Sequence, residues 1–405
     1  MKKTYVIAGA GLAGASAAAA LRTGGFDGRV LLLGEERERP YERPELSKKY
    51  LRGEPDVDLA VHDAEFYAAN EIELTTGRQA ERIDLGTRQV GLADGGSLAY
   101  DKLLLATGAA PRTLDVPGAE LDGVLTLRTK ADADAIRERS MAAAAIVVVG
   151  GGWIGSEVAA SLRELGRDVT LVLPTQAPLE RVLGPEVAAV YRAAHEEHGV
   201  RLVTRTTVTK LHGRGRVASV VTSDGQTLPA ELVVVGVGAD PRSRLAADAG
   251  LAVGGGILVD ERLQTADAAV FAAGDVANTL HPIYGRLRVE HWDNAKWQGR
   301  AAARSMLGGD RAYDRIPYFY SDQYDLGMEY TGLAPAWDDV VFRGDPASRE
   351  FIAFWLRDGR VVAGMNMNVW DVADQIEHLV RGGLAVDRAL LADVGRPLVD
   401  LASAA

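Results

Sequence analysis

Short apolar runs alternate with alanine-rich or amphipathic segments along most of the chain. Residues 4–9 form a β-branched and apolar run, a glycine turn follows, and "ASAAAALRTGG" (15–25) has the composition of a helix that ends at two glycines. A second apolar run, "RVLLLG", occupies residues 29–34. Strand, helix and strand in this order predict a βαβ unit at the N-terminus.

The same pattern recurs at residues 145–173, where "AIVVVGGG" precedes the helical segment "SEVAASLRELG" and the apolar run "DVTLVL". Further apolar runs end in glycine-containing turns at 100–112, 231–242 and 268–278. From residue 318 onward the chain is rich in aromatic residues and alternating strands, with Asp358-Gly359 at a hairpin turn. We therefore predict an α/β protein with two Rossmann-like nucleotide-binding domains and a C-terminal α+β domain.

Each βαβ unit carries three glycines at the spacing G-x-G-x-x-G between its first strand and its helix. The first glycine permits a tight bend, the second lets a pyrophosphate approach the backbone, and the third lets the helix pack on the strand. The helix N-terminus then offers N–H donors and a positive dipole end to the anion. The six glycines are Gly9, Gly11 and Gly14 in the first turn, and Gly150, Gly152 and Gly155 in the second.

An acidic residue about 20 positions after such a turn binds the ribose hydroxyls. In the first unit Glu35 and Glu36 follow "RVLLLG", which fits an adenosine ribose. In the second unit the corresponding place reads "LPT" (173–175), with no acid and no arginine before Arg181. The second nucleotide is therefore NAD or NADP, and the residues leave that choice open.

Two dinucleotide sites in one chain indicate a relay in which a nicotinamide delivers hydride to a flavin. The first turn is then expected to hold FAD and the second NADH or NADPH. The chain has 405 residues, 47% of them hydrophobic, and a formal net charge of −11, which argues against non-specific binding to nucleic acid or anionic membranes.

The chain contains no cysteine. This excludes disulfides, thiolate metal sites, cysteine-ligated iron–sulfur clusters and thiol nucleophiles. No apolar run reaches the length of a spanning helix. The N-terminus, "MKKTYVIAGAGLAGASAAAAL", is similar to a signal peptide, but its glycine spacing is better explained by the strand–turn–helix, and a cytoplasmic location is expected.

Eight motifs in a fixed order resemble the FAD-dependent NAD(P)H:ferredoxin reductases of oxygenase and cytochrome P450 systems, the putidaredoxin reductase and rhodocoxin reductase type, to which apoptosis-inducing factor is related. They are "PYERPELSKKYLRG" (40–53), "LLLATGAAPR" (103–112), "LRTKADADAIR" (127–137), "GGGWIGSEVAASL" (150–162), "VVGVGADPR" (234–242), "VFAAGDVAN" (270–278), "VEHWDNAKWQG" (289–299) and "YFYSDQYDLGMEYTG" (318–332). The resemblance implies a glutathione-reductase-like fold. The predicted domains are an FAD-binding domain (1–112 and 240–317), an NAD(P)-binding domain (113–239) and a C-terminal interface domain (318–405).

The resemblance also implies roles for individual residues. Lys48 and Glu157 would act at the reacting groups, Lys48 near the flavin and Glu157 near the nicotinamide carboxamide, where the two could pair. The residues implied in FAD binding are Ala13, Glu35, Arg43, Lys48, Ala80, Arg128, Asp275 and Trp292. Those implied in nicotinamide nucleotide binding are Gly152, Ile154, Gly155, Glu157 and Gly238.

The chain departs from the family pattern at three places. Glu45 replaces the second of two prolines before "LSK", Tyr320 stands where a tryptophan is common, and no acid lies near residue 173. The last departure leaves the preference for NADH or NADPH open.

Several of these residues also have simpler readings. Lys48 could be one of many solvated lysines, Glu157 could interact with the dipole of its helix alone, and Asp275 could cap a helix. His195 and His198 lie three residues apart, which is not a zinc-ligand spacing, so we expect a solvated helix face and no metal site.

The predicted activity transfers electrons from NAD(P)H through FAD to a small iron–sulfur ferredoxin. Lys296, Arg300 and Arg304 are spaced by four residues and would form one basic stripe that docks an acidic ferredoxin, or merely a solvated helix face. One alternative is direct reduction of a small oxidant such as a quinone or monodehydroascorbate. Another is a flavin-containing signalling protein like apoptosis-inducing factor.

Overall fold

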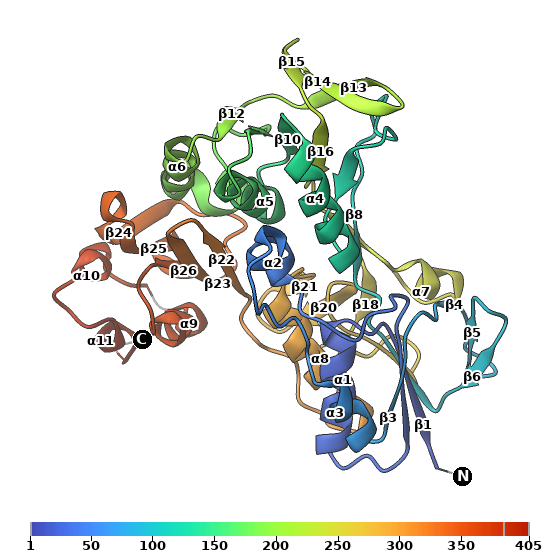
Figure 1. The fold of residues 1–405 in the computed structure, drawn as a ribbon. Helices are drawn as coiled ribbons and strands as arrows, with labels where there is room; N and C mark the ends of the chain where they lie inside the picture. The colour runs from blue at the N-terminus through green and yellow to red at the C-terminus, as the bar shows by residue number, and fades with distance from the viewer. Residues whose placement is uncertain (1, 384, 404–405) are drawn as a thin grey trace. The chain divides into compact units, whose positions relative to one another are not determined.

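A computed structural model describes residues 2–383 and 385–403 of the chain (Figure 1). The chain divides into two compact units. Unit 1 contains residues 1–43, 58–110 and 239–315, and unit 2 contains residues 44–57, 111–238 and 316–405. Each unit is assembled from segments that are distant in sequence, and each is described by itself.

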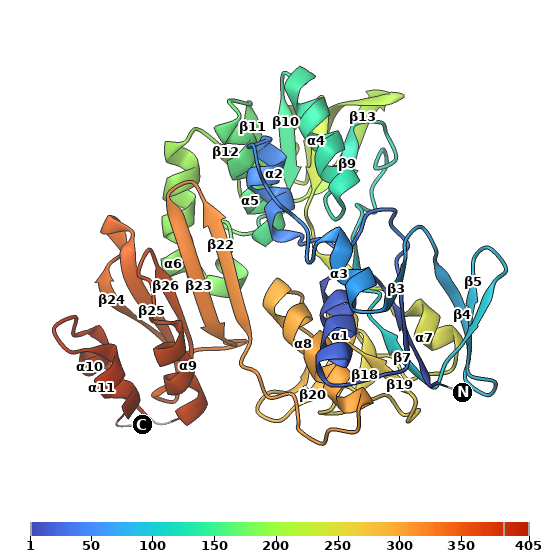
Figure 2. The same cartoon turned by 60° about the horizontal axis from the view of Figure 1, so that its bottom comes forward.

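Unit 1 is built on a parallel five-stranded sheet in the order β19-β7-β1-β2-β3. Its apolar strands are buried on both faces, as expected for a parallel sheet covered by helices. Helix α1 packs against α8 (Figure 2). Gly299 of α8 lies so close to α1 that an added Cβ would be 2.2 Å from the carbonyl oxygen of Ala13. The strands of the sheet and these two helices are β1 (Thr4–Ala8), α1 (Leu12–Thr23), β2 (Arg29–Leu33), β3 (Ile72–Thr75), β7 (Lys102–Leu105), β19 (Val270–Ala272) and α8 (Trp292–Met306).

Smaller elements complete unit 1 around this sheet. They are α3 (Ala64–Ala69), the antiparallel strands β4 (Ala80–Asp84), β5 (Gln89–Leu92) and β6 (Ser97–Ala99), the paired strands β8 (Ala109–Pro111) and β17 (Ala239–Pro241), α7 (Arg244–Asp248), and the sheet of β18 (Ile257–Val259), β20 (Ala277–His281) and β21 (Gly285–Leu287).

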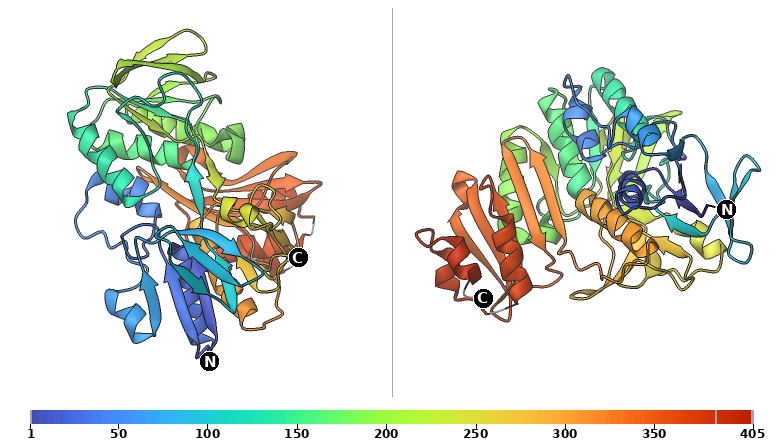
Figure 3. Two further views of the ribbon diagram at one scale, coloured as in Figure 1. Left: turned by 90° about the vertical axis from the view of Figure 1, so that its right-hand side faces the viewer. Right: turned by 90° about the horizontal axis from the view of Figure 1, so that it is seen from below.

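Unit 2 contains a second parallel five-stranded sheet in the order β12-β11-β10-β16-β9. A three-stranded antiparallel sheet, β13-β14-β15, packs on it through a shared apolar cluster and is seen at one end of the unit in Figure 3. The elements are β9 (Val124–Thr126), α4 (Lys130–Ala142), β10 (Ile146–Val149), α5 (Trp153–Glu164), β11 (Val169–Val172), α6 (Glu180–Glu197), β12 (Arg201–Val203), β13 (Val208–Arg214), β14 (Arg216–Thr222), β15 (Thr227–Pro229) and β16 (Leu232–Val235). The short segment 44–57 adds the 3₁₀ turn η1 (Pro44–Ser47) and α2 (Lys49–Arg52) to this unit.

The C-terminal part of unit 2 is an antiparallel sheet in the order β22-β23-β26-β25-β24 (Figure 2). One face packs on α6, where the indole N–H of Trp355 donates to the carbonyl oxygen of Leu183, and the other face packs on α9. The elements are β22 (Tyr318–Gln323), β23 (Leu326–Gly332), β24 (Asp339–Asp345), η2 (Pro346–Ser348), β25 (Glu350–Arg357), β26 (Arg360–Met367), α9 (Ala373–Gly382), α10 (Arg388–Ala392) and α11 (Leu398–Ser403).

The predicted fold class is confirmed. Two doubly wound parallel sheets are present, each containing one of the predicted βαβ units, and an α+β sheet follows them. The predicted hairpin at Asp358 and Gly359 joins β25 to β26, and both residues have the positive φ that this turn requires. Among the described residues no helix combines the length and the apolar character needed to cross a membrane.

Candidate functional site

The first glycine turn, between β1 and α1, has the shape of a phosphate cradle. Gly9 has a φ of 121°, and an added Cβ would lie 2.1 Å from the carbonyl oxygen of Ala106. A Cβ on Gly14 would lie 2.0 Å from the carbonyl oxygen of Gly9, so the helix packs directly on the turn. A Cβ on Gly11 would meet nothing within 4 Å, and no side chain caps α1. The turn therefore leaves open space and unsatisfied N–H donors where a pyrophosphate binds.

The second glycine turn, between β10 and α5, repeats this geometry. Gly150 has a φ of 111°, and its Cβ would lie 2.3 Å from the carbonyl oxygen of Gly236. A Cβ on Gly155 would lie 1.9 Å from the carbonyl oxygen of Gly150, whereas Gly152 again faces open space at an uncapped helix start. Both turns thus fit the pyrophosphate of a dinucleotide, one in each unit.

Unit 1 holds most of the residues that the sequence assigns to FAD. Ala13 and Asp275 are buried, and Ala80 begins β4. Glu35 forms an ion pair with Arg242. No helix follows Asp275, because β20 begins at Ala277, so the helix-cap reading of that aspartate is wrong.

Arg43 is also in unit 1. Its guanidinium is held by Glu36 at 2.6 Å and by the hydroxyl of Tyr41 at 3.0 Å, and that hydroxyl donates to the other oxygen of Glu36. Glu36, the second of the two acidic residues after β2, therefore orients Arg43.

Trp292 is the first residue of α8, and the ammonium of Lys296 lies 4.6 Å from the centre of its ring. The guanidinium of Arg300 lies 4.9 Å from the ring of Trp297, a comparable cation–π distance. Lys296, Arg300 and Arg304 all lie on this one helix, as the predicted basic stripe requires, and Arg300 and Arg304 are exposed.

In unit 2, Ile154 is exposed beside the second glycine turn, as the second residue of α5. Gly238 has a φ of 102°, and its carbonyl oxygen accepts from the backbone N–H of Arg112. Arg128 precedes α4, and its backbone N–H donates to the side chain of Asp132 at 3.0 Å.

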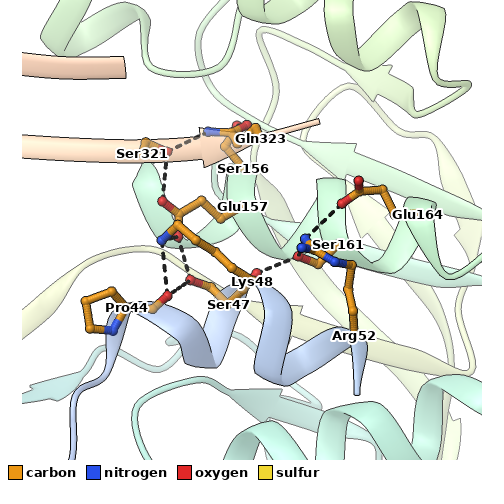
Figure 4. Close-up of polar contacts among 10 residues, drawn as sticks. All are labelled: Pro44, Ser47, Lys48, Arg52, Ser156, Glu157, Ser161, Glu164, Ser321 and Gln323. Carbon is orange, nitrogen blue, oxygen red and sulfur yellow. Dashed lines mark hydrogen bonds and ion pairs between the residues drawn. The ribbon is translucent and has the colours of Figure 1, made fainter. Parts of the chain in front are cut away.

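Lys48 and Glu157 form a buried ion pair in unit 2 (Figure 4). The Nζ atom of Lys48 lies 2.8 Å from Oε2 of Glu157, and the two side chains are 6% and 4% exposed. Lys48 also donates to the carbonyl oxygen of Pro44 at 3.1 Å and lies 5.5 Å from the ring centre of Tyr320. The expected pairing is confirmed, and the reading of Lys48 as a solvated lysine is wrong.

Glu157 is the fifth residue of α5, beyond its first turn, so the helix dipole is not its main partner. Its carboxylate accepts from Lys48, from the hydroxyl of Ser47 and, on the other oxygen, from the hydroxyl of Ser321 at 2.7 Å (Figure 4). The three donors come from segment 44–57 and β22. Sequence reasoning missed both serines, although each lies in a motif quoted above, because nothing in a linear pattern indicates that they meet.

A second polar cluster continues from Ser321. The amide nitrogen of Gln323 donates to Ser321 at 3.2 Å, and its oxygen accepts from Ser156 at 2.7 Å and lies 3.1 Å from Nε2 of His195. The hydroxyl of Tyr324 lies 3.1 Å from Nδ1 of the same histidine. Ser156 precedes Glu157 on α5, so the cluster fixes the helix turn that carries the carboxylate.

His195 is therefore not on a solvated helix face, and that expectation is wrong. Its side chain is fully buried, and burial lowers its pKa to about 4, although the hydrogen bond to Gln323 opposes this shift. His198 is half-buried and stacks on Tyr324. Within the described residues no group of histidine, aspartate and glutamate side chains has the arrangement of a metal site.

Comparisons with known proteins agree with this geometry. The pyridine nucleotide-disulphide oxidoreductase model matches residues 3–299, and the reductase C-terminal model matches residues 318–402. Rhodocoxin reductase of Rhodococcus erythropolis is 40% identical over 370 residues, which cover 90% of this chain and 86% of that protein. The biphenyl dioxygenase system ferredoxin–NAD(+) reductase component of Paraburkholderia xenovorans is 37% identical over 405 residues, 100% of this chain and 99% of that protein.

A crystal structure of a ferredoxin reductase from Rhodopseudomonas palustris superimposes with a TM-score of 0.95 at 37% identity, covering 99% of this chain and 100% of that one. The resemblance to the ferredoxin reductases of oxygenase systems is thereby confirmed. The chain is an oxidoreductase that belongs to the pyridine nucleotide-disulphide oxidoreductase family.

Proposed function

We propose that this protein is a FAD-dependent NAD(P)H:ferredoxin oxidoreductase that supplies a cytochrome P450 or another oxygenase. The observation that carries the proposal is the pair of matching glycine cradles in a chain without cysteine. FAD, when bound, accepts a hydride from a nicotinamide and gives up its two electrons one at a time. An iron–sulfur ferredoxin takes single electrons, and the similar component of the biphenyl dioxygenase system is a ferredoxin–NAD(+) reductase.

The absence of cysteine separates this function from disulfide reduction, the other chemistry of the pyridine nucleotide-disulphide oxidoreductase family. Disulfide reduction proceeds through a thiolate that attacks a disulfide sulfur. This chain has no thiol to do so. Electrons therefore reach the final acceptor without passing through a cysteine of this chain.

Most of the residues proposed for FAD lie in unit 1, and those proposed for the nicotinamide nucleotide lie in unit 2. Gly9, Gly11 and Gly14 hold the FAD pyrophosphate, Ala13 and Ala80 lie along its adenosine side, and Glu35 accepts from the ribose hydroxyls. Arg43 and Asp275 would bind the polar part of FAD, Trp292 would pack on its ring, and Arg128 would contribute a further contact. In unit 2, Gly150, Gly152 and Gly155 hold the nicotinamide nucleotide, which Ile154 and Gly238 flank. The proposed domains are 1–112 with 240–317 for FAD, 113–239 for NAD(P) and 318–405 at the C-terminus, although residues 44–57 pack in the same compact unit as residues 111–238.

Lys48 and Glu157 position the reacting groups. A buried ammonium stabilises negative charge on a neighbouring acceptor, and the effect is strong because little water screens it. Glu157 holds Nζ of Lys48 at a fixed place, and Ser47 and Ser321 hold Glu157 in turn. Neither residue needs to donate a proton, since hydride transfer depends on distance and orientation.

The basic stripe of α8, defined by Lys296, Arg300 and Arg304, is proposed to dock the ferredoxin. Ferredoxins of this type are expected to present acidic surfaces, and a stripe of like charges steers an oppositely charged partner. The protein as a whole is acidic, with a net charge of −11, so an acidic partner needs such a local patch. We place the reaction in the cytoplasm.

The test is a reductase assay with the FAD-loaded protein, a candidate ferredoxin and cytochrome c as the final acceptor. Gly11→Val and Gly152→Val each place a side chain into open space at a backbone conformation that valine adopts, so both variants should fold. Gly11→Val should lose FAD, and Gly152→Val should keep FAD but lose reduction by NAD(P)H. The proposal would be contradicted if the rate of cytochrome c reduction did not depend on ferredoxin. It would also be contradicted if both variants kept full activity.

A further inference from the structure

The two parallel sheets can be compared residue by residue through their hydrogen bonds. The backbone N–H of Gly9 donates to the carbonyl oxygen of Leu33 at 2.9 Å, and that of Gly150 donates to Val172 at 2.8 Å. Leu33 and Val172 therefore occupy equivalent positions at the ends of β2 and β11. Two residues further on, the position of Glu35 in unit 1 corresponds to Pro174 in unit 2. The acid that suits a ribose with free hydroxyls is thus replaced by proline.

The next strand shows a second exchange. The backbone N–H of Gly77 donates to the carbonyl oxygen of Glu36 at 2.8 Å, and the backbone N–H of Arg205 donates to that of Thr175 at 3.0 Å. Glu36 lies three residues after Leu33, and Thr175 lies three residues after Val172, so these two residues are equivalent. Gly77 therefore corresponds to Arg205. Both positions lie at the carboxyl ends of parallel strands, where nucleotides bind in doubly wound sheets.

Compared with unit 1, unit 2 therefore has a proline in place of an acid and an arginine in place of a glycine at two equivalent positions near the carboxyl ends of its strands. We propose that Arg205, together with Gln176, binds the 2′-phosphate of NADPH, so that the donor is NADP(H) rather than NAD(H). This inference rests on the proposed function and names its substrate. A carboxylate at position 174 would repel the phosphate, whereas the planar guanidinium of Arg205 presents paired donors to it.

The surroundings of Arg205 leave it available to an anion. Its side chain is exposed, and its Nη2 atom donates to the amide oxygen of Gln176 at 2.7 Å. No described carboxylate forms an ion pair with it. The nearby carboxylate of Glu180 accepts from the backbone N–H groups of Gln176 and Ala177, at 2.8 and 2.9 Å, and is held within its own loop. The carboxylate of Asp224 accepts hydrogen bonds from the side chains of Thr206, Thr222 and Gln226, and Thr206 directly follows Arg205.

The test measures binding of adenosine 2′,5′-bisphosphate and of 5′-AMP to the FAD-loaded protein by calorimetry. These probes differ only in the 2′-phosphate, and bound FAD keeps them from the first cradle. The wild-type protein should bind the bisphosphate at least about tenfold more tightly, which is the size of one charge-assisted contact. Arg205→Ala should remove this difference, and Pro174→Glu should reverse it.

Arg201→Ala is the matched control, because Arg201 is an exposed arginine at the opposite, amino end of β12. It should leave the preference unchanged. Two results with the wild-type protein would overturn the inference: equal affinity for the two probes, or no binding of either. It would also be overturned if Arg205→Ala kept the preference for the bisphosphate, or if Arg201→Ala lost that preference to the same extent as Arg205→Ala. The proposed function fails by a different result, namely no reduction of the flavin by either NADH or NADPH. Reduction by NADH without any effect of the 2′-phosphate defeats the inference alone.

Discussion

Replacing Lys48 by methionine should destabilise unit 2 through the charge that it leaves behind. The substitution keeps most of the side-chain volume but removes the ammonium 2.8 Å from Glu157. The carboxylate is 4% exposed and would then have only the hydroxyls of Ser47 and Ser321 as partners. Breaking a buried pair in this way costs about 3–5 kcal/mol.

For a unit of this size, 1 kcal/mol shifts the unfolding midpoint by about 2–4 °C, so Lys48→Met should lower it by at least about 6 °C. The double variant Lys48→Met/Glu157→Gln removes both charges and should recover much of the loss. Arg192→Met is the matched control, because Arg192 pairs with Glu196 on the surface of the same unit and such a pair contributes at most about 1 kcal/mol.

The assay is thermal unfolding followed by circular dichroism, with FAD in constant excess and again after its removal. This separates lost packing from lost cofactor affinity, since a ligand that binds only the folded state raises the midpoint. An unfolding midpoint of Lys48→Met equal to that of Arg192→Met, or a double variant less stable than Lys48→Met alone, would contradict this prediction.

Three further predictions follow from the structure. Burial lowers the pKa of His195 from about 6.5 in the unfolded chain to about 4 in the folded protein. The stability that comes from keeping this histidine neutral is therefore fully present above about pH 6.5, and it is lost as the pH falls toward 4. His195→Asn should show a weaker fall of the unfolding midpoint over this range, and an unchanged slope would contradict the assignment. Gly155→Ala should unfold unit 2 or abolish nucleotide binding, because its Cβ would lie 1.9 Å from the carbonyl oxygen of Gly150, whereas Gly152→Ala should fold normally; circular dichroism of both variants decides. Charge reversal at Arg300 and Arg304 should raise the KM for ferredoxin and weaken its salt dependence, with the rate of flavin reduction unchanged, and unaltered ferredoxin kinetics would place the docking surface elsewhere.

The local features of the fold could be predicted from sequence because each has a short-range cause. The glycine turns at Gly9 and Gly150 require backbone conformations and close approaches that only glycine allows, so their spacing specifies the strand–turn–helix. The hairpin at Asp358-Gly359 is specified in the same way by positive φ at both residues.

The surroundings of Glu157 could not be predicted, because they depend on contacts between distant segments. Ser47 and Ser321 are separated from Glu157 by more than a hundred residues each. Nothing in the sequence pattern indicates that residues 44–57 pack within unit 2.

The burial of His195, in contrast, had a usable signal. It follows Tyr191 by four residues and Val187 by eight, and all three are fully buried on one face of α6. Helical periodicity would have placed it in the core, where its polar atoms need partners.

The central claim is that the chain holds FAD and that a nicotinamide nucleotide reduces it. Anaerobic stopped-flow mixing of the purified yellow protein with NADH, and separately with NADPH, tests this most directly by following the flavin absorbance. We expect the flavin absorbance to bleach in a single turnover. If Arg205 binds the 2′-phosphate, the rate of bleaching should be higher with NADPH than with NADH. A colourless protein that takes up no FAD, or a bound flavin that neither nucleotide reduces, would contradict it.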